Sequence, residues 1–182
     1  SAVALDQSGA PALFRPGQGV QPLALADYGF GAEKAVSPAW SPDGRQLAWV
    51  LLDQNNAVGV IDLENRTGSQ IHPFSGGGPT LPTLAWSPDG AWLALSSWGE
   101  GGKSTPVLSV MRPDGSQDLA LANGVQPVWS PDGRFLVYSF TPPGASSSLE
   151  DQVFVAESGV WQPLLLPLEP GAKPIGWVRL TP

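Results

Sequence analysis

The amino-acid sequence predicts an all-β fold built from repeated units, on three observations. Gly and Pro contribute 22 and 20 of the 182 residues while only 14% are charged, a turn-rich composition typical of many short strands. Hydrophobic residues make up 42% of the chain and stand in short runs separated by Gly, Pro, Asp and Ser, so the chain can bury a core. The sequence Trp-Ser-Pro-Asp-Gly occurs three times.

The charge and composition exclude several classes of partner. A net charge of -7 with only nine Lys and Arg argues against nucleic acid and against an anionic membrane surface, because both require clustered cations. The absence of cysteine excludes disulfides and thiolate metal sites but leaves the compartment open. We expect a chain that does not span a membrane, because no apolar run approaches about 20 residues. The start of the chain lacks the basic region of a signal peptide, so we expect an exported protein to have lost its signal already.

The motif copies are regularly spaced. They begin at Trp40, Trp86 and Trp129, steps of 46 and 43 residues, and a further step of 48 reaches Trp177, in a copy without Ser-Pro-Asp-Gly. A period in the low-to-middle forties is that of a four-stranded propeller blade. The sequence therefore predicts a β-propeller of about four antiparallel blades with one incomplete, or a segment of a larger propeller.

The chemistry of the motif fits a tight hairpin between the two innermost strands of each blade. Proline presets φ at the second turn position, aspartate tolerates the third, and glycine takes a positive φ. We interpret the aspartates as turn formers and the tryptophans as inter-blade packing residues, because a residue repeated in every blade is usually architectural; an aromatic ligand platform is the alternative. The repeat residues are Trp40, Pro42, Asp43, Gly44, Trp86, Pro88, Asp89, Gly90, Trp129, Pro131, Asp132, Gly133 and Trp177.

A strand, a turn and a second strand follow each motif copy in a common register, and these predict the outer hairpin of each blade. The expected blades and closing strand cover residues 37–74, 83–122, 126–166 and 174–182. Residues 1–15 resemble an outer hairpin, so we expect them to form a composite blade with the closing strand. No candidate exists for the second strand of that blade. Residues 16–36 are expected to form an insertion between blades, where recognition often takes place.

The pattern Pro-x-Trp-Ser-Pro-Asp-Gly-x-x-Leu-Ala resembles the WD40-like repeat of the TolB-like bacterial propellers, over about residues 38–180. We expect the chain to depart from TolB itself, without a preceding α/β domain and with fewer blades. The resemblance implies a protein-binding or scaffolding module that is periplasmic, secreted or at the cell surface. It equally suits the substrate-gating propeller of prolyl-oligopeptidase-like or tricorn-like peptidases.

The sequence offers little chemistry, so we expect no enzyme activity, no cofactor and no metal. A Gly-x-Ser-x-Gly nucleophile elbow is absent, which excludes an α/β-hydrolase site within this chain. His72 is the only histidine; a catalytic triad could use it, but we interpret it as a structural or exposed strand residue. The segment 114–118 spaces its oxygen ligands like part of a calcium loop but lacks the closing glutamate.

The leading hypothesis is thus a non-catalytic interaction module that holds a protein partner or joins an assembly through its unpaired terminal strands. The alternatives are the propeller portion of a larger peptidase, and a small-ligand or sugar binder that uses tryptophans outside the repeat. The candidate partner surface consists of Trp98, Glu100, Trp92 and Trp161.

Overall fold

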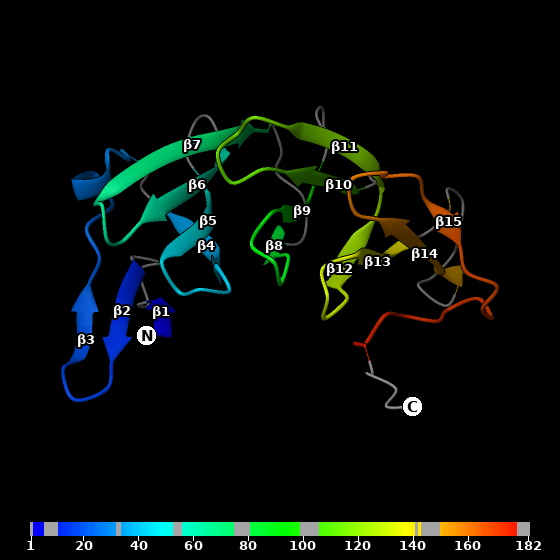
Figure 1. Ribbon diagram of the computed structural model, residues 1–182, viewed down its shortest axis with the longest axis horizontal. Helices are drawn as coiled ribbons and strands as arrows, with labels where there is room; N and C mark the ends of the chain where they lie inside the picture. Colours follow the sequence, from blue (N-terminus) through cyan, green and yellow to red (C-terminus); the bar gives the residue numbers. More distant parts are fainter. Residues whose placement is uncertain are drawn as a thin grey trace.

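The computed structural model describes residues 2–5, 11–31, 34–52, 56–74, 81–98, 106–140, 142 and 150–177. Apart from the short 3-10 helix η1 (Leu25–Tyr28), the regular elements among these residues are strands in four antiparallel sheets. Figure 1 shows the sheets side by side along an open arch, with the N-terminal sheet at one foot and the C-terminal segment at the other. The prediction of an all-β fold is therefore confirmed.

The three motif copies coincide with three four-stranded sheets, each running in sequence order from its motif strand outward. The second sheet comprises β4 (Ala35–Trp40), β5 (Gln46–Leu51), β6 (Ala57–Asp62) and β7 (Thr67–Pro73). The third comprises β8 (Thr83–Trp86), β9 (Leu93–Trp98), β10 (Pro106–Met111) and β11 (Asp118–Asn123). The fourth comprises β12 (Val125–Trp129), β13 (Phe135–Phe140), β14 (Gln152–Glu157) and β15 (Leu164–Leu165). The motif strands β4, β8 and β12 lie on the concave side of the arch and β7 and β11 on its convex side (Figure 1).

The first sheet has three strands: β1 (Ala2–Leu5), β2 (Pro11–Arg15) and β3 (Gly19–Pro22). The sequence predicts an outer hairpin over residues 1–15 and an insertion over 16–36, whereas the structure pairs part of that insertion, β3, with β2. The reversal follows from Gly17 and Gly19, whose φ values of 80° and 76° are available to glycine without a steric cost. The N-terminal hairpin thus takes the second and third positions of a blade, and β1 forms the inner edge.

The closing strand expected over residues 174–182 falls only partly on described residues. Residues 174–177 have no strand assignment, and the rest of that segment lies outside the described residues.

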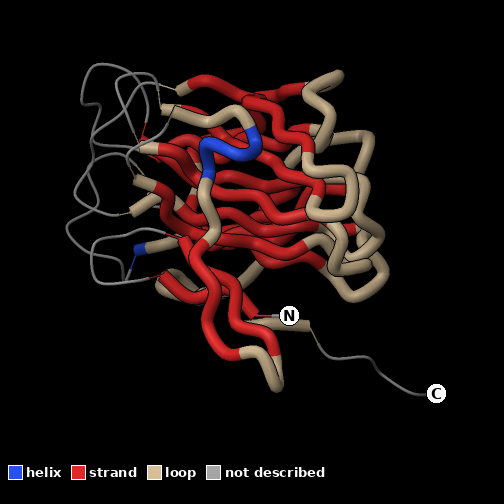
Figure 2. The backbone as a smooth tube through the Cα atoms, turned by 90° about the vertical axis from the view of Figure 1, so that its left-hand side faces the viewer, coloured by secondary structure: helices blue, strands red, loops and turns tan. Residues whose placement is uncertain are grey.

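The hydrophobic core is divided into three clusters, one between each pair of neighbouring sheets. Leu13 of β2 and Trp49 of β5 belong to the first cluster, Val60 and Leu95 to the second, and residues from the third and fourth sheets to the last. Each sheet therefore contacts only its neighbours, as in other repeat proteins. Seen from the side, the tight turns gather along one end of the stacked strands (Figure 2).

Candidate functional site

The Ser-Pro-Asp-Gly turns use their polar groups internally. The Ser41 hydroxyl donates to Asp43 Oδ1 at 2.6 Å and accepts the N–H of Gln46 at 2.9 Å, while the N–H of Arg45 donates to Asp43 Oδ1 at 3.1 Å. The other two copies repeat these three contacts. The turn glycines have φ values of 71–72°, the left-handed region that the sequence predicts. The hydrogen bond from Ser41, and then that from the Arg45 N–H, lowers the pKa of Asp43.

The motif tryptophans join neighbouring inner strands through their indole N–H groups. Trp86 Nε1 donates to the carbonyl oxygen of Ala39 at 2.9 Å, and Trp129 Nε1 donates to that of Ala85 at 3.3 Å. Trp177 Nε1 donates to the carbonyl oxygen of Val128, also at 3.3 Å. Every acceptor belongs to the residue immediately before the tryptophan of the preceding sheet. We call this series of contacts between successive sheets the tryptophan ladder.

Trp40 departs from the tryptophan ladder. Its Nε1 is buried and has no hydrogen-bond partner among the described residues. By the rule of the other copies, its acceptor would lie on an inner strand of the first sheet. That sheet runs β1-β2-β3 and, in the described part of the chain, has no strand on the inner side of β1.

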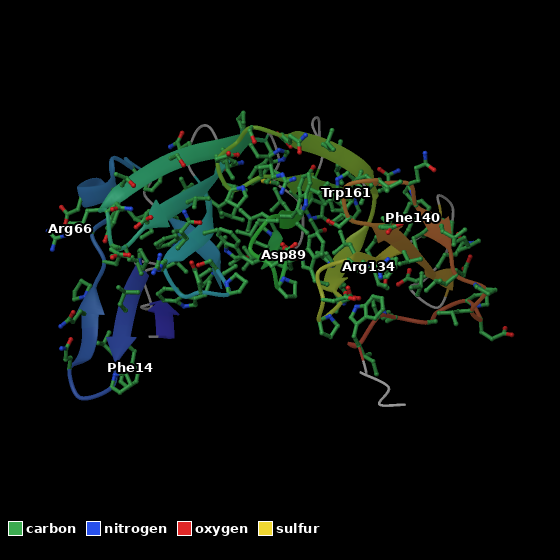
Figure 3. The ribbon with its side chains drawn as sticks, in the orientation of Figure 1. Phe14, Arg66, Asp89, Arg134, Phe140 and Trp161 are labelled. Carbon is green, nitrogen blue, oxygen red and sulfur yellow. The ribbon has the colours of Figure 1, made fainter. Side chains whose placement is uncertain are left out.

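The tryptophans outside the repeat are mostly packed. Trp92 is only 4% exposed; its ring meets Trp161 edge-on at 4.9 Å between centroids, and the Arg112 guanidinium lies 3.8 Å above it. Trp161 is half-buried beside Trp129, between the third and fourth sheets (Figure 3). These two residues of the candidate partner surface therefore serve inter-sheet packing. Glu100 lies outside the described residues.

Trp98 lines a hollow of about 350 Å³ at the end of the strands opposite the Ser-Pro-Asp-Gly turns. Ser96, Ser97 and Gln126 contribute polar groups to it. Asp151, whose side chain is 5% exposed, lies 3.9 Å from the Lys173 ammonium there. This hollow has the size and the mixed polar and aromatic lining of a small-ligand pocket.

A second, more open groove of about 550 Å³ lies at the turn end of the second and third sheets. Asp62, Asp114 and Arg112 line it. Hydrogen bonds lower the pKa of both carboxyls, from the Asn65 N–H to Asp62 and from the Ser116 side chain to Asp114. Carboxyls with lowered pKa values remain ionised at neutral pH and are poor general acids.

The remaining candidate for chemistry is His72, on β7. Its Nδ1 lies 2.6 Å from Asp118 Oδ2 on β11, so the pair connects the second and third sheets. No group of three or more His, Asp or Glu side chains suited to a metal ion occurs within the described residues. The same residues include no helix long and apolar enough to cross a membrane.

Comparisons with known proteins identify the kind of repeat. No protein-family model matches the chain. Over 139 residues, 71% of the chain and 20% of the relative, it is 29% identical to the uncharacterized peptidase YuxL of Bacillus subtilis (strain 168). Over 73 residues, 38% of the chain and 16% of the relative, it is 37% identical to the Tol-Pal system protein TolB of Alcanivorax borkumensis. The chain thus spans a fifth or less of the length of these relatives.

Solved structures of low sequence identity share the fold. TolB from Acinetobacter baumannii matches 91% of the chain and 40% of its own length with a TM-score of 0.60 and 20% identity. The β-propeller domain of the Trilobed protease from Pyrococcus furiosus matches 92% of the chain and 52% of its own length, with a TM-score of 0.62 and 13% identity. The chain has a β-propeller fold and resembles the TolB-like propellers. The propeller fold and the family resemblance predicted from the repeat are confirmed, and the four sheets of this TolB-like propeller are its blades.

Proposed function

We propose that this TolB-like propeller is a non-catalytic module that binds another protein. The observation that carries the proposal is that the repeated polar side chains serve the scaffold. In all three complete motif copies the serine and aspartate close a turn, and the indole N–H groups of Trp86 and Trp129 join neighbouring blades. Side chains used in this way hold loops and edges in place for recognition. The TolB relative is a protein of the Tol-Pal system, which favours a protein partner. The resemblance also favours an extracytoplasmic location.

The test is a binding measurement on the full-length protein. We expect a saturable complex with a protein of the host's Tol-Pal system by isothermal titration calorimetry, and no turnover of chromogenic peptide or ester substrates. Hydrolysis by the purified full-length protein, together with no binding to any Tol-Pal protein, would overturn the proposal.

A second candidate is the propeller portion of a larger peptidase. It is favoured by the match to the uncharacterized peptidase YuxL, which covers 71% of this chain against 38% for TolB, and by the fold shared with part of an acylaminoacyl peptidase. In this role the nucleophile belongs to a separate domain, and the propeller restricts which substrates reach it. The complete reading frame distinguishes the two functions, because a hydrolase domain with a Gly-x-Ser-x-Gly elbow is required by the second and not by the first.

A further inference from the structure

The third blade departs from the second at the end of its second strand. Val50 and Leu52 pack into the cluster between the second and third blades. The residues at the same distance from the motif tryptophan of the third blade are Ser96 and Trp98. Alternate residues of a strand share a face, so these two face the fourth blade, yet neither belongs to the described cluster between those blades. A hydroxyl and an indole thus replace apolar packing at the hollow of about 350 Å³.

The hollow lies between two four-stranded blades. Ser96 and Trp98 line it from the third blade, and Gln126 and Asp151 line it from the fourth. The Ser96 hydroxyl donates to the carbonyl oxygen of Gly124 at 3.0 Å, which fixes the hydroxyl and leaves its lone pairs free to accept a second bond. The hollow is therefore built by the contact between two neighbouring blades.

Gln126 carries an amide that the fold does not use. Its φ is 55°, in the left-handed region that is unfavourable for a residue with a side chain. Ser37 stands at the same position of the second blade and has a φ of 54°; its hydroxyl donates to the carbonyl oxygen of Pro82, directly before the third blade. The Gln126 amide makes no hydrogen bond within the described part of the chain. The backbone conformation that serves an internal bond in the second blade thus holds a free donor and acceptor at the hollow.

Asp151 brings a buried carboxylate to the hollow. Its side chain is only 5% exposed, and the Lys173 ammonium lies 3.9 Å away, which is too far for a hydrogen bond. An ionised carboxylate has about four lone-pair positions, so Asp151 can accept hydrogen bonds from a ligand. Asp151 and Lys173 are the only charged residues among the described ones that line the hollow. An anion would be repelled by the first and a cation by the second, so the lining favours a neutral polar ligand.

We propose that this hollow is a binding site for a neutral saccharide of one or two rings. Sugar hydroxyls both donate and accept, so they match the acceptor Asp151 and the mixed donor and acceptor groups of Ser96 and Gln126. The apolar C–H face of the ring packs on the indole of Trp98. A wholly apolar ligand would bury the Gln126 amide without a partner, which costs free energy. The inference goes beyond the proposed protein-binding function and does not depend on it.

Titrations followed by saturation-transfer difference NMR on the full-length protein test the ligand class. The neutral probes are methyl glucoside, methyl galactoside and methyl mannoside, which differ only in the configuration of their hydroxyls. We expect at least one of them to bind saturably, and to bind more tightly than the 2-amino and uronic acid forms of the same sugar, which carry one positive and one negative charge. Binding of none of the neutral probes, or tighter binding of either charged form, would overturn the proposal.

Two variants test the site. Gln126→Ala removes an amide that holds nothing in the fold, so the melting temperature should stay that of the wild type while the affinity for the sugar falls about twofold to tenfold. Trp98→Leu gives the third blade the residue that the second blade has and should abolish saturable binding. Gln70→Ala is the matched control, because Gln70 is exposed on β7 and lies outside the hollow; its affinity should equal that of the wild type. Wild-type affinity in Gln126→Ala and Trp98→Leu would contradict the site. A protein that binds a Tol-Pal partner but no sugar loses this inference and keeps the proposed function.

Discussion

Comparing Trp86→Phe with Trp40→Phe tests the contribution of the tryptophan ladder to stability. Both substitutions shrink an indole to a benzene ring between two blades, although Trp86 is buried and Trp40 is half-buried. Only Trp86 loses a hydrogen bond, the 2.9 Å contact with the carbonyl of Ala39, because the N–H of Trp40 has no partner among the described residues. Losing a bond that leaves its partner buried costs about 1–3 kcal/mol, whereas removing an unpaired donor costs nothing. We expect Trp86→Phe to lower the free energy of unfolding by about 1–2 kcal/mol more than Trp40→Phe.

The measurement is urea unfolding followed by far-UV circular dichroism, with the slopes compared to ensure that both variants unfold from equally compact states. Trp86→Ala measures how much the whole Trp86 side chain contributes to the free energy of unfolding. It removes a side chain that is only 9% exposed and should cost about 3–5 kcal/mol, as other large aromatic truncations do. A loss below about 1 kcal/mol for Trp86→Ala would contradict its packing role. If the two Phe variants differ by less than about 0.5 kcal/mol, the ladder bonds do not stabilise the fold and the reasoning fails.

Three further perturbations test the turns and the core. Gly90→Ala should cost about 1–2 kcal/mol because φ there is 72°, whereas Gly31→Ala, with open space around its Cβ, should leave the melting temperature unchanged; equal shifts would contradict the turn assignment. Tyr138→Phe should be neutral or stabilising, because the buried Tyr138 hydroxyl has no partner among the described residues. Burial raises the pKa of Tyr138 to about 12, so the wild type alone should lose stability through this group as the pH rises above about 10; a matching alkaline loss in the variant would refute this. The serine hydroxyls of their turns lower the pKa values of Asp43 and Asp132. These carboxylates should therefore stabilise the fold at pH values above their unfolded pKa of about 4, and this contribution should be lost as the pH decreases further. A urea midpoint that stays constant from pH 5 to 2.5 would contradict this direction.

The turn geometry could be predicted from the sequence because the contacts that make it are local. The hydroxyl of Ser41 reaches the carboxylate two residues later and the N–H five residues later. A positive φ at Gly44 follows from the same short segment. The period between copies then fixes the number of strands per blade. Composition, turn chemistry and period thus determine the architecture without knowledge of any distant contact.

The ladder could not be predicted in the same way, because it joins residues far apart in the chain. The donor and acceptor of its central bond, Trp129 and Ala85, are 44 positions apart, and the contact depends on how two blades stack. The regular tryptophan spacing was a sign of the ladder, but spacing alone does not identify the acceptor. The third strand of the first blade was missed for a different reason. Residues 16–22 lack the alternation of a half-buried strand, since β3 is exposed along its length.

The packing of the blades predicts which described blade opens at the lowest free energy. Stability in a stacked array is a sum over each unit and its neighbours, and the second and third blades each have two neighbours. Among the described residues the first blade contacts one neighbouring blade and leaves Phe14 and Val20 exposed; Figure 3 shows Phe14 at the outer tip of its hairpin. Units with few buried contacts open at the lowest free energy. The β2 amides should therefore exchange with solvent faster than those of β5 and β9 in a native-state hydrogen-exchange measurement; slower exchange at β2 would contradict this order of stability.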